Sequence, residues 1–136
     1  MEKILIIILV LMQLSGCIRH IPVKAQQSDD AIYFDIEQHG IIFKTNIPVT
    51  CAAVFKIDIG DVNKAKPLWE FCAPEMSSYF LTNPQHIKYG VTPNGYIEKV
   101  NPKELQHNEI YQFRFHGPGN AGGVKFTYST KTTPNK

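Results

Sequence analysis

The sequence has 136 residues, of which 43% are hydrophobic and 11% aromatic, and this content is sufficient for a folded core. The formal net charge is +2 and only two arginines are present, so the chain lacks the basic run or stripe on which nucleic-acid binding depends. The length predicts a single domain.

The N-terminal residues have the order of a bacterial lipoprotein signal. Residues 1–3 are short and charged, and residues 4–12 form an apolar run that is shorter than the about 20 residues a membrane-spanning helix needs. Leu14-Ser15-Gly16-Cys17 then matches the lipobox, in which an apolar and two small residues precede the modified cysteine. We predict a cleaved signal peptide over residues 1–16 and a lipid on the Cys17 thiol. The alternative is an ordinary cleaved signal with a chance cysteine.

Lipid on Cys17 predicts a location in the cell envelope. Two or three acyl chains, such as palmitate, anchor a protein durably without a spanning helix. Ile18 stands where an Asp commonly retains lipoproteins at the inner membrane, so we expect the periplasmic face of the outer membrane if the source is Gram-negative. Pro22, Gln26, Gln27, Ser28, Asp29 and Asp30 bring little apolar content to the next segment, and we predict a flexible tether over residues 17–30.

The rest of the chain alternates apolar and polar residues with a period of two, which predicts half-buried antiparallel strands. Gly, Pro, Asn and Asp clusters separate these segments, as turns do. Seven or eight short strands in about 100 residues predict a two-sheet sandwich. The alternating segments lie at residues 32–37, 41–47, 51–59, 87–91, 111–115 and 124–128.

The sequence has three cysteines, and Cys51 and Cys72 remain after the anchor is assigned. An exported protein lies in a compartment that permits disulfides. Pairing the two would close a loop of roughly 22 residues, which the loop-entropy argument values at about 3 kcal/mol. A metal site is the alternative, but the five histidines lack ligand spacing. We predict a Cys51–Cys72 disulfide, and no metal or other cofactor.

A segment near the end of the chain sharpens the fold prediction. Leu105, Asn108 and Tyr111 have the order of the tyrosine corner of immunoglobulin and fibronectin type III domains, where the Tyr hydroxyl bonds back to the turn backbone. The alternative is that Tyr111 is a plain core aromatic. We predict an all-β, immunoglobulin/fibronectin type III-like antiparallel β-sandwich over residues 31–129, followed by a polar tail at 130–136.

No catalytic motif pairs a nucleophile with a base, so we predict a protein that is not an enzyme. Loops are the usual carriers of binding residues. We take residues 59–67, 73–85 and 117–123 as candidate partner-binding loops, the last as a long hairpin connection. The candidate contact residues are Trp69, Met76, Tyr79, Phe80 and Asn120. For Trp69 we favour the alternative of core packing against the disulfide.

The domain resembles the type VI secretion immunity periplasmic lipoproteins. The resemblance spans about residues 30–128 and rests on the lipobox, on Cys51 at the start of a strand, on the run from Tyr89 to Gly95, and on the segment from Leu105 to Tyr111. It implies a membrane-anchored protein that binds and neutralises a secreted toxin. An accessory structural lipoprotein of a secretion system or pilus is the alternative function.

Overall fold

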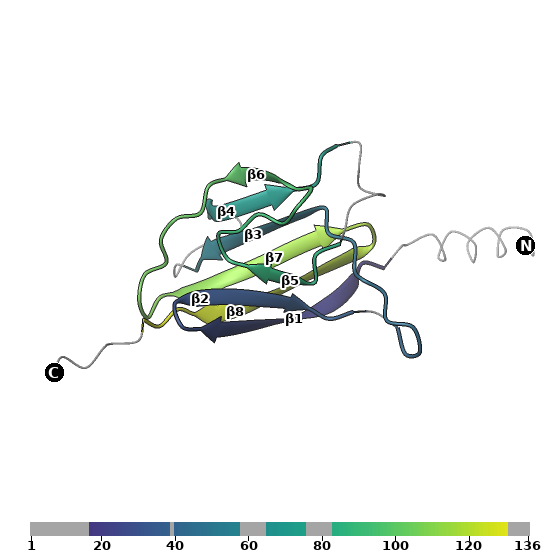
Figure 1. The fold of residues 1–136 in the computed structure, drawn as a ribbon, viewed down its shortest axis with the longest axis horizontal. Helices are drawn as coiled ribbons and strands as arrows, with labels where there is room; N and C mark the ends of the chain where they lie inside the picture. Colours follow the sequence, from purple (N-terminus) through teal and green to yellow (C-terminus); the bar gives the residue numbers. More distant parts are fainter. Residues whose placement is uncertain (1–16, 39, 58–64, 76–82, 131–136) are drawn as a thin grey trace, which may run out of the picture.

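Figure 1 shows a computed structural model of the protein, which describes residues 17–38, 40–57, 65–75 and 83–130. Over these ranges the chain forms strands and no helix, so the predicted all-β class is confirmed. The predicted signal peptide lies outside the described residues, as does the polar tail after Thr130. None of the described segments is a helix long and apolar enough to cross a membrane. The strands are β1 (Arg19–Ser28), β2 (Ala31–Ile36), β3 (Cys51–Lys56), β4 (Pro67–Cys72), β5 (His86–Lys88), β6 (Ile97–Val100), β7 (Ile110–Gly117) and β8 (Asn120–Thr127).

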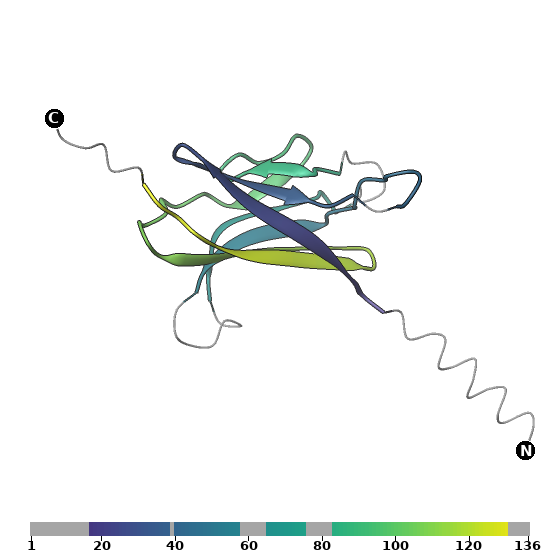
Figure 2. The ribbon, with the colours of Figure 1, turned by 90° about the horizontal axis from the view of Figure 1, so that it is seen from below.

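The strands form one curled, mixed sheet in the order β5-β2-β1-β8-β7-β3-β4-β6. Six of the seven pairings are antiparallel, as predicted, whereas β1 runs parallel to β8. β1 pairs with β8 over Arg19 to Pro22 and with β2 from Val23 onward. Figure 2 shows β1 crossing diagonally between two layers, one containing β2 and the other β8. The immunoglobulin-like type of sandwich stays a prediction.

The predicted tether is wrong, because residues 19–28 are β1. Its inward residues Ile21 and Val23 are buried, while Pro22 between them and the polar residues after them are exposed. Pro22 cannot donate a backbone hydrogen bond, and it lies where β1 changes partner, a place where a strand tolerates proline. On β8, a Cβ at Gly122 would lie 2.3 Å from the Ile21 carbonyl oxygen, so the glycine permits β1 to approach.

The core lies between the two layers of the curled sheet. Phe34 of β2 stacks on Phe113 of β7 with ring centroids 4.2 Å apart, although the two strands are not neighbours in the sheet. Trp69 and Phe71 of β4 and Tyr111 of β7 are also buried in this core. Large aromatic side chains contribute most of the burial that stabilises a small domain.

The strands predicted at residues 32–37, 111–115 and 124–128 are confirmed to within a few residues at their ends. The strands predicted at 51–59 and 87–91 are shorter, at Cys51–Lys56 and His86–Lys88, and residues 58 and 59 lie outside the described residues. The strand predicted over residues 41–47 is wrong, because only Thr45 makes a single bridge there. Gly40 has a φ of 121°, and its missing Cβ would lie 2.0 Å from the Phe43 carbonyl oxygen. The chain therefore folds back on itself at residues 40–43 and cannot extend.

The predicted Cys51–Cys72 disulfide is present, and it joins facing residues of β3 and β4. Successive side chains of a strand point to opposite faces, so the disulfide and the buried Trp69 lie on opposite faces of the sheet. The core position of Trp69 is therefore confirmed, but its predicted packing against the disulfide is wrong. Trp69 instead packs against Phe71 and Tyr89, and its indole Nε1 donates to Glu98 Oε2 over 3.4 Å.

The predicted hydroxyl bond of Tyr111 is also confirmed. The backbone N–H of Gln106 donates to Tyr111 Oη over 2.7 Å, and that hydroxyl lies 3.4 Å from the Gln106 carbonyl oxygen. Asn108, the turn residue before β7, has a φ of 62°, a left-handed conformation that Asn tolerates better than most residues. The buried ring of Tyr111 thus holds the turn that leads into β7.

Candidate functional site

β1 runs from one end of the domain to the other. Cys17 is an exposed free thiol, and β1 begins two residues later at Arg19, whose N–H donates to the Gly119 carbonyl over 2.9 Å. β1 is 10 residues long and therefore spans about 30 Å at the usual rise of a strand. The turn after Ser28 thus lies at the end opposite to Cys17, which we call the distal end.

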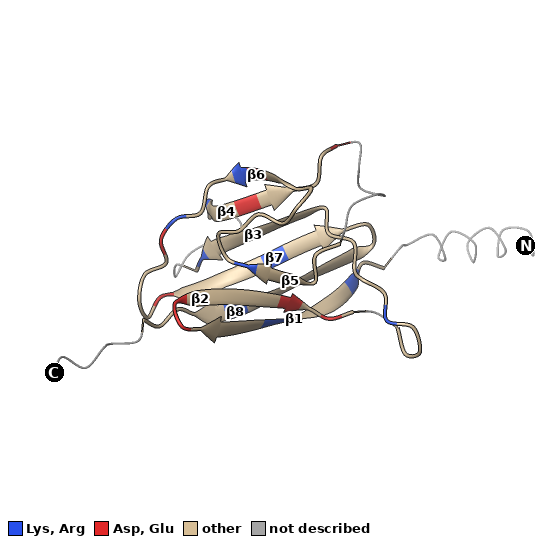
Figure 3. Cartoon of the chain, in the orientation of Figure 1, with Lys and Arg blue, Asp and Glu red and all other residues tan. Residues whose placement is uncertain are grey.

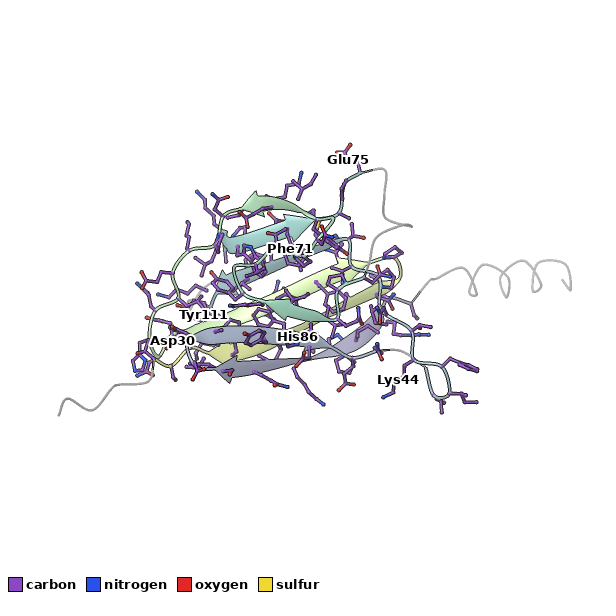
Figure 4. All side chains as sticks on the ribbon, in the orientation of Figure 1. Asp30, Lys44, Phe71, Glu75, His86 and Tyr111 are labelled. Carbon is purple, nitrogen blue, oxygen red and sulfur yellow. A yellow bond between two sulfur atoms is a disulfide. The ribbon has the colours of Figure 1, made fainter. Side chains whose placement is uncertain are left out.

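The distal end carries a hollow of about 570 Å³. Four segments of the chain surround it: the β1–β2 turn, the end of β5, the loop before β7, and the residue after β8. Figure 4 labels Asp30 at this end and Lys44 at the other. The hollow is lined by Ser28, Asp29, Asp30, Ala31, Ile32, Tyr33, Lys88, Tyr89, Glu104, Leu105 and Tyr128.

The first wall is the tight turn between β1 and β2. Ser28 pairs with Ala31, so only Asp29 and Asp30 form the connection, and Asp29 adopts a φ of 53°. Short polar residues such as Asp tolerate this conformation because their side chains bond the local backbone. Gln27 donates to the Asp29 carbonyl over 3.0 Å and accepts from the Ser129 N–H over 3.1 Å. The turn is therefore tied to the chain that leaves β8.

The opposite wall is the loop before β7, which joins to the end of β5. Tyr89 Oη donates to the Lys103 carbonyl over 2.6 Å, and Leu105 is buried. Burial raises the pKa of Tyr89 to about 12, although its bond with the Lys103 backbone acts in the other direction. Tyr89 therefore stays neutral at physiological pH and holds this wall in place.

Three carboxylates and one amine line the distal hollow. The carboxylates belong to Asp29, Asp30 and Glu104, and the amine belongs to Lys88. In Figure 3, acidic segments lie around the β1–β2 turn, on a chain whose net charge is positive. Such a surface attracts cationic groups and gives carbonyl and carboxylate acceptors to arginine or lysine donors.

A second, smaller hollow of about 340 Å³ lies on the outer face of β3, β4 and β7. Its floor includes Ala53 and Phe55, and the disulfide residue Cys51 borders it. The Arg114 guanidinium lies 5.8 Å from the centre of the Phe55 ring, within the range of a cation–π contact. This outer hollow has one carboxylate, Glu70, and is less acidic than the distal one.

One acid–base pair lies outside both hollows. His86 Nδ1 bonds Asp35 Oδ1, and the imidazole stacks on the Tyr33 ring at 5.0 Å between centroids. Within the described residues, the side-chain bond of the His86 ring is the one to Asp35. Within the same ranges no three His, Cys, Asp or Glu side chains are grouped to hold a metal ion.

The predicted binding residues lie in three different situations in the structure. Trp69 is fully buried and cannot contact a partner. Met76, Tyr79 and Phe80 lie outside the described residues, as does most of the 59–67 loop. Asn120 is the first residue of β8, where its side chain donates to the Pro118 carbonyl over 3.0 Å. The predicted long connection at 117–123 is wrong, because Gly117 pairs with Asn120 and leaves a two-residue turn.

Sequence reasoning missed the distal hollow. Asp29 and Asp30 fall within the predicted tether, although an Asp pair between two strands is also a hairpin signal. Glu104 and Lys88 carry no local signal that would bring them together, because only the fold places β5 beside the loop before β7.

Comparisons with protein-family models, with curated proteins and with solved structures find no match for the chain. The resemblance to type VI immunity lipoproteins therefore stays a prediction that rests on the residues quoted above.

Proposed function

We propose that this protein is a lipid-anchored, non-enzymatic binding module on the periplasmic face of the outer membrane, and that it neutralises a secreted toxin by covering it. The observation that carries the proposal is the link between Cys17 and β1, which consists of the single residue Ile18. With a lipid on Cys17, so short a link holds the near end of the domain at the bilayer. The distal hollow then faces away from the membrane, about 30 Å along β1.

The distal hollow suits a partner with a basic face. A stable protein interface covers about 800 Å² on each partner, so the hollow would take one or two anchoring side chains within a larger contact. An arginine or lysine of the toxin would enter between Asp30 and Glu104, which belong to different segments. Complementary charge also speeds the encounter between the two proteins, which matters when a toxin must be captured before it acts.

The test is survival of a strain challenged by toxin-delivering kin. Deleting the gene, in a strain shown to lack a second copy, should make the strain sensitive, and the wild-type gene should restore survival. The variant Asp30→Lys with Glu104→Lys should fail to restore it, because it reverses the charge of the distal hollow. Asp29 is left unchanged because its backbone conformation holds the turn.

The matched control is Glu37→Lys with Glu109→Lys, which changes the net charge equally at surface positions outside both hollows and outside the candidate binding loops. It should restore survival like the wild type, and all variants must reach equal abundance. Restoration by the distal variant would contradict the assignment of the hollow. Unchanged survival of the deletion strain would end the immunity proposal and leave the accessory role in an envelope assembly.

A further inference from the structure

Exposed apolar side chains gather at the end of the domain that carries Cys17. Seven large hydrophobic residues are exposed in the described part of the chain, and four of them are Ile18, Ile41, Ile42 and Phe43. Ile41 is 101% exposed, Ile42 84% and Phe43 83%. Figure 1 and Figure 2 both place the loop of residues 40–45 at the end where the chain enters β1. An apolar cluster of this kind on a folded domain marks a binding surface.

The loop has a defined shape that presents these side chains. The positive φ of Gly40 and the close Phe43 carbonyl make a turn that an added Cβ would not allow. The base of the loop is fixed, because Asn46 accepts a hydrogen bond of 2.8 Å from Gln38 and Ile47 is buried in the core. Three consecutive apolar residues are thus held at the tip of a loop with an anchored base.

Charge at this end is compatible with a phospholipid surface. Lys44 follows the apolar tip directly, and Arg19 lies at the start of β1. Figure 3 shows basic segments at this end, and Figure 4 labels Lys44 beside the loop. The nearby acidic Glu37 is paired with Lys24 at 3.2 Å. Cationic residues flanking an apolar tip are the arrangement that binds an anionic lipid interface.

We infer that Ile41, Ile42 and Phe43 insert into the periplasm-facing leaflet of the membrane to which Cys17 is attached, as a second point of contact. The inference rests on the proposed lipid anchor. Interfacial apolar groups enter the headgroup boundary by about 5–10 Å, a depth that the tip of one loop can reach. Two contacts at one end prevent the domain from rotating about a single anchor, and they keep the distal hollow turned toward the periplasm.

The experiment uses the full-length protein, purified from membranes in detergent and reconstituted in vesicles of phosphatidylethanolamine and phosphatidylglycerol with brominated acyl chains. A Phe43→Trp variant places a fluorescent reporter in the tip, and an Ile110→Trp variant places one at an exposed position near the distal end. Wild-type emission from the buried Trp69 is subtracted from both. The Phe43→Trp signal should fall about twofold relative to unbrominated vesicles, while Ile110→Trp stays unchanged, because bromine quenches only an inserted ring.

Two further variants test whether the neighbours of the reporter matter. Adding Ile41→Ser and Ile42→Ser to the Phe43→Trp protein should reduce the quenching. The matched pair Val91→Ser and Ile97→Ser, which removes exposed apolar residues elsewhere, should not. Equal quenching at both reporter positions would overturn the inference. An unquenched Phe43→Trp reporter would also overturn it, and would leave a protein partner as the group that covers the apolar tip.

The mass of the N-terminal peptide, measured on the same sample, reports whether Cys17 carries lipid. Quenching with an unmodified Cys17 would sustain the inserted loop and reject the anchor. A lipidated Cys17 without quenching would reject the loop alone, and loss of both would reject both.

Discussion

At the scale of single residues, buried hydroxyl groups hold the loops against the sheet. Tyr96 Oη donates to the Val49 carbonyl over 2.7 Å, and Tyr111 Oη accepts from the Gln106 N–H. Each bond satisfies a backbone group of an irregular segment. Burial raises the pKa of Tyr96 to about 12, so its hydroxyl remains a donor at physiological pH.

Removing the Tyr111 hydroxyl tests this role. Tyr111→Phe should lower the free energy of unfolding by about 1 kcal/mol, because it removes one hydrogen bond and keeps the buried ring. Urea denaturation followed by Trp69 fluorescence measures the change. Tyr128→Phe is the control, since its hydroxyl makes no bond within the described ranges. Equal losses in both variants, or none for Tyr111→Phe, would show that Tyr111 acts only as a core aromatic.

At the scale of strands, the sequence predicted an element only where its two faces differed clearly in polarity. β2 and β7 bury every second residue, and both were predicted. β6 was missed because all its residues are at least partly exposed and it is held at the sheet edge by pairing with β4. β1 was missed because it has only two inward aliphatic residues, Ile21 and Val23. Pro22 and the polar residues after Lys24 make the alternation of apolar and polar residues too weak to recognise.

The candidate site was predicted less well than the fold, for a related reason. Alternation and turn chemistry act between residues close in the sequence, whereas the distal hollow joins Asp30 to Glu104 and Lys88 through the curled sheet. Conversely, the Cys51–Cys72 disulfide was predicted because it needs only two cysteines in an oxidising compartment. Its position between facing residues of β3 and β4 required the strand register.

The disulfide should contribute to the stability of the β3–β4 pair. Replacing both cysteines by alanine, or reducing the wild type, should lower the free energy of unfolding by about 3 kcal/mol, because the unfolded chain gains the freedom of the open loop. Urea denaturation with and without reductant measures this. Reductant should have no effect on the double-alanine variant, so an equal effect on both proteins would contradict the assignment.

At the scale of the whole molecule, Cys17, the proposed anchor, and the apolar loop lie at the end opposite to the distal hollow. Cys17 and residues 41–43 occupy one end, and the Asp29–Asp30 turn occupies the other. Because β1 begins almost at the cysteine, a lipid there would set the orientation of the entire sheet, which a flexible tether would not do. Orientation is therefore a property of the first strand and not of a separate linker.

Lipid attachment at Cys17 underlies both the proposed orientation and the proposed function. The most direct measurement is incorporation of radiolabelled palmitate into the protein in the native host, compared between the wild type and Cys17→Ala. We predict label in the wild type, recovered with the membrane fraction, and none in Cys17→Ala at equal abundance. Equal labelling of the two proteins, or an unlabelled wild type beside a labelled control lipoprotein, would contradict the account.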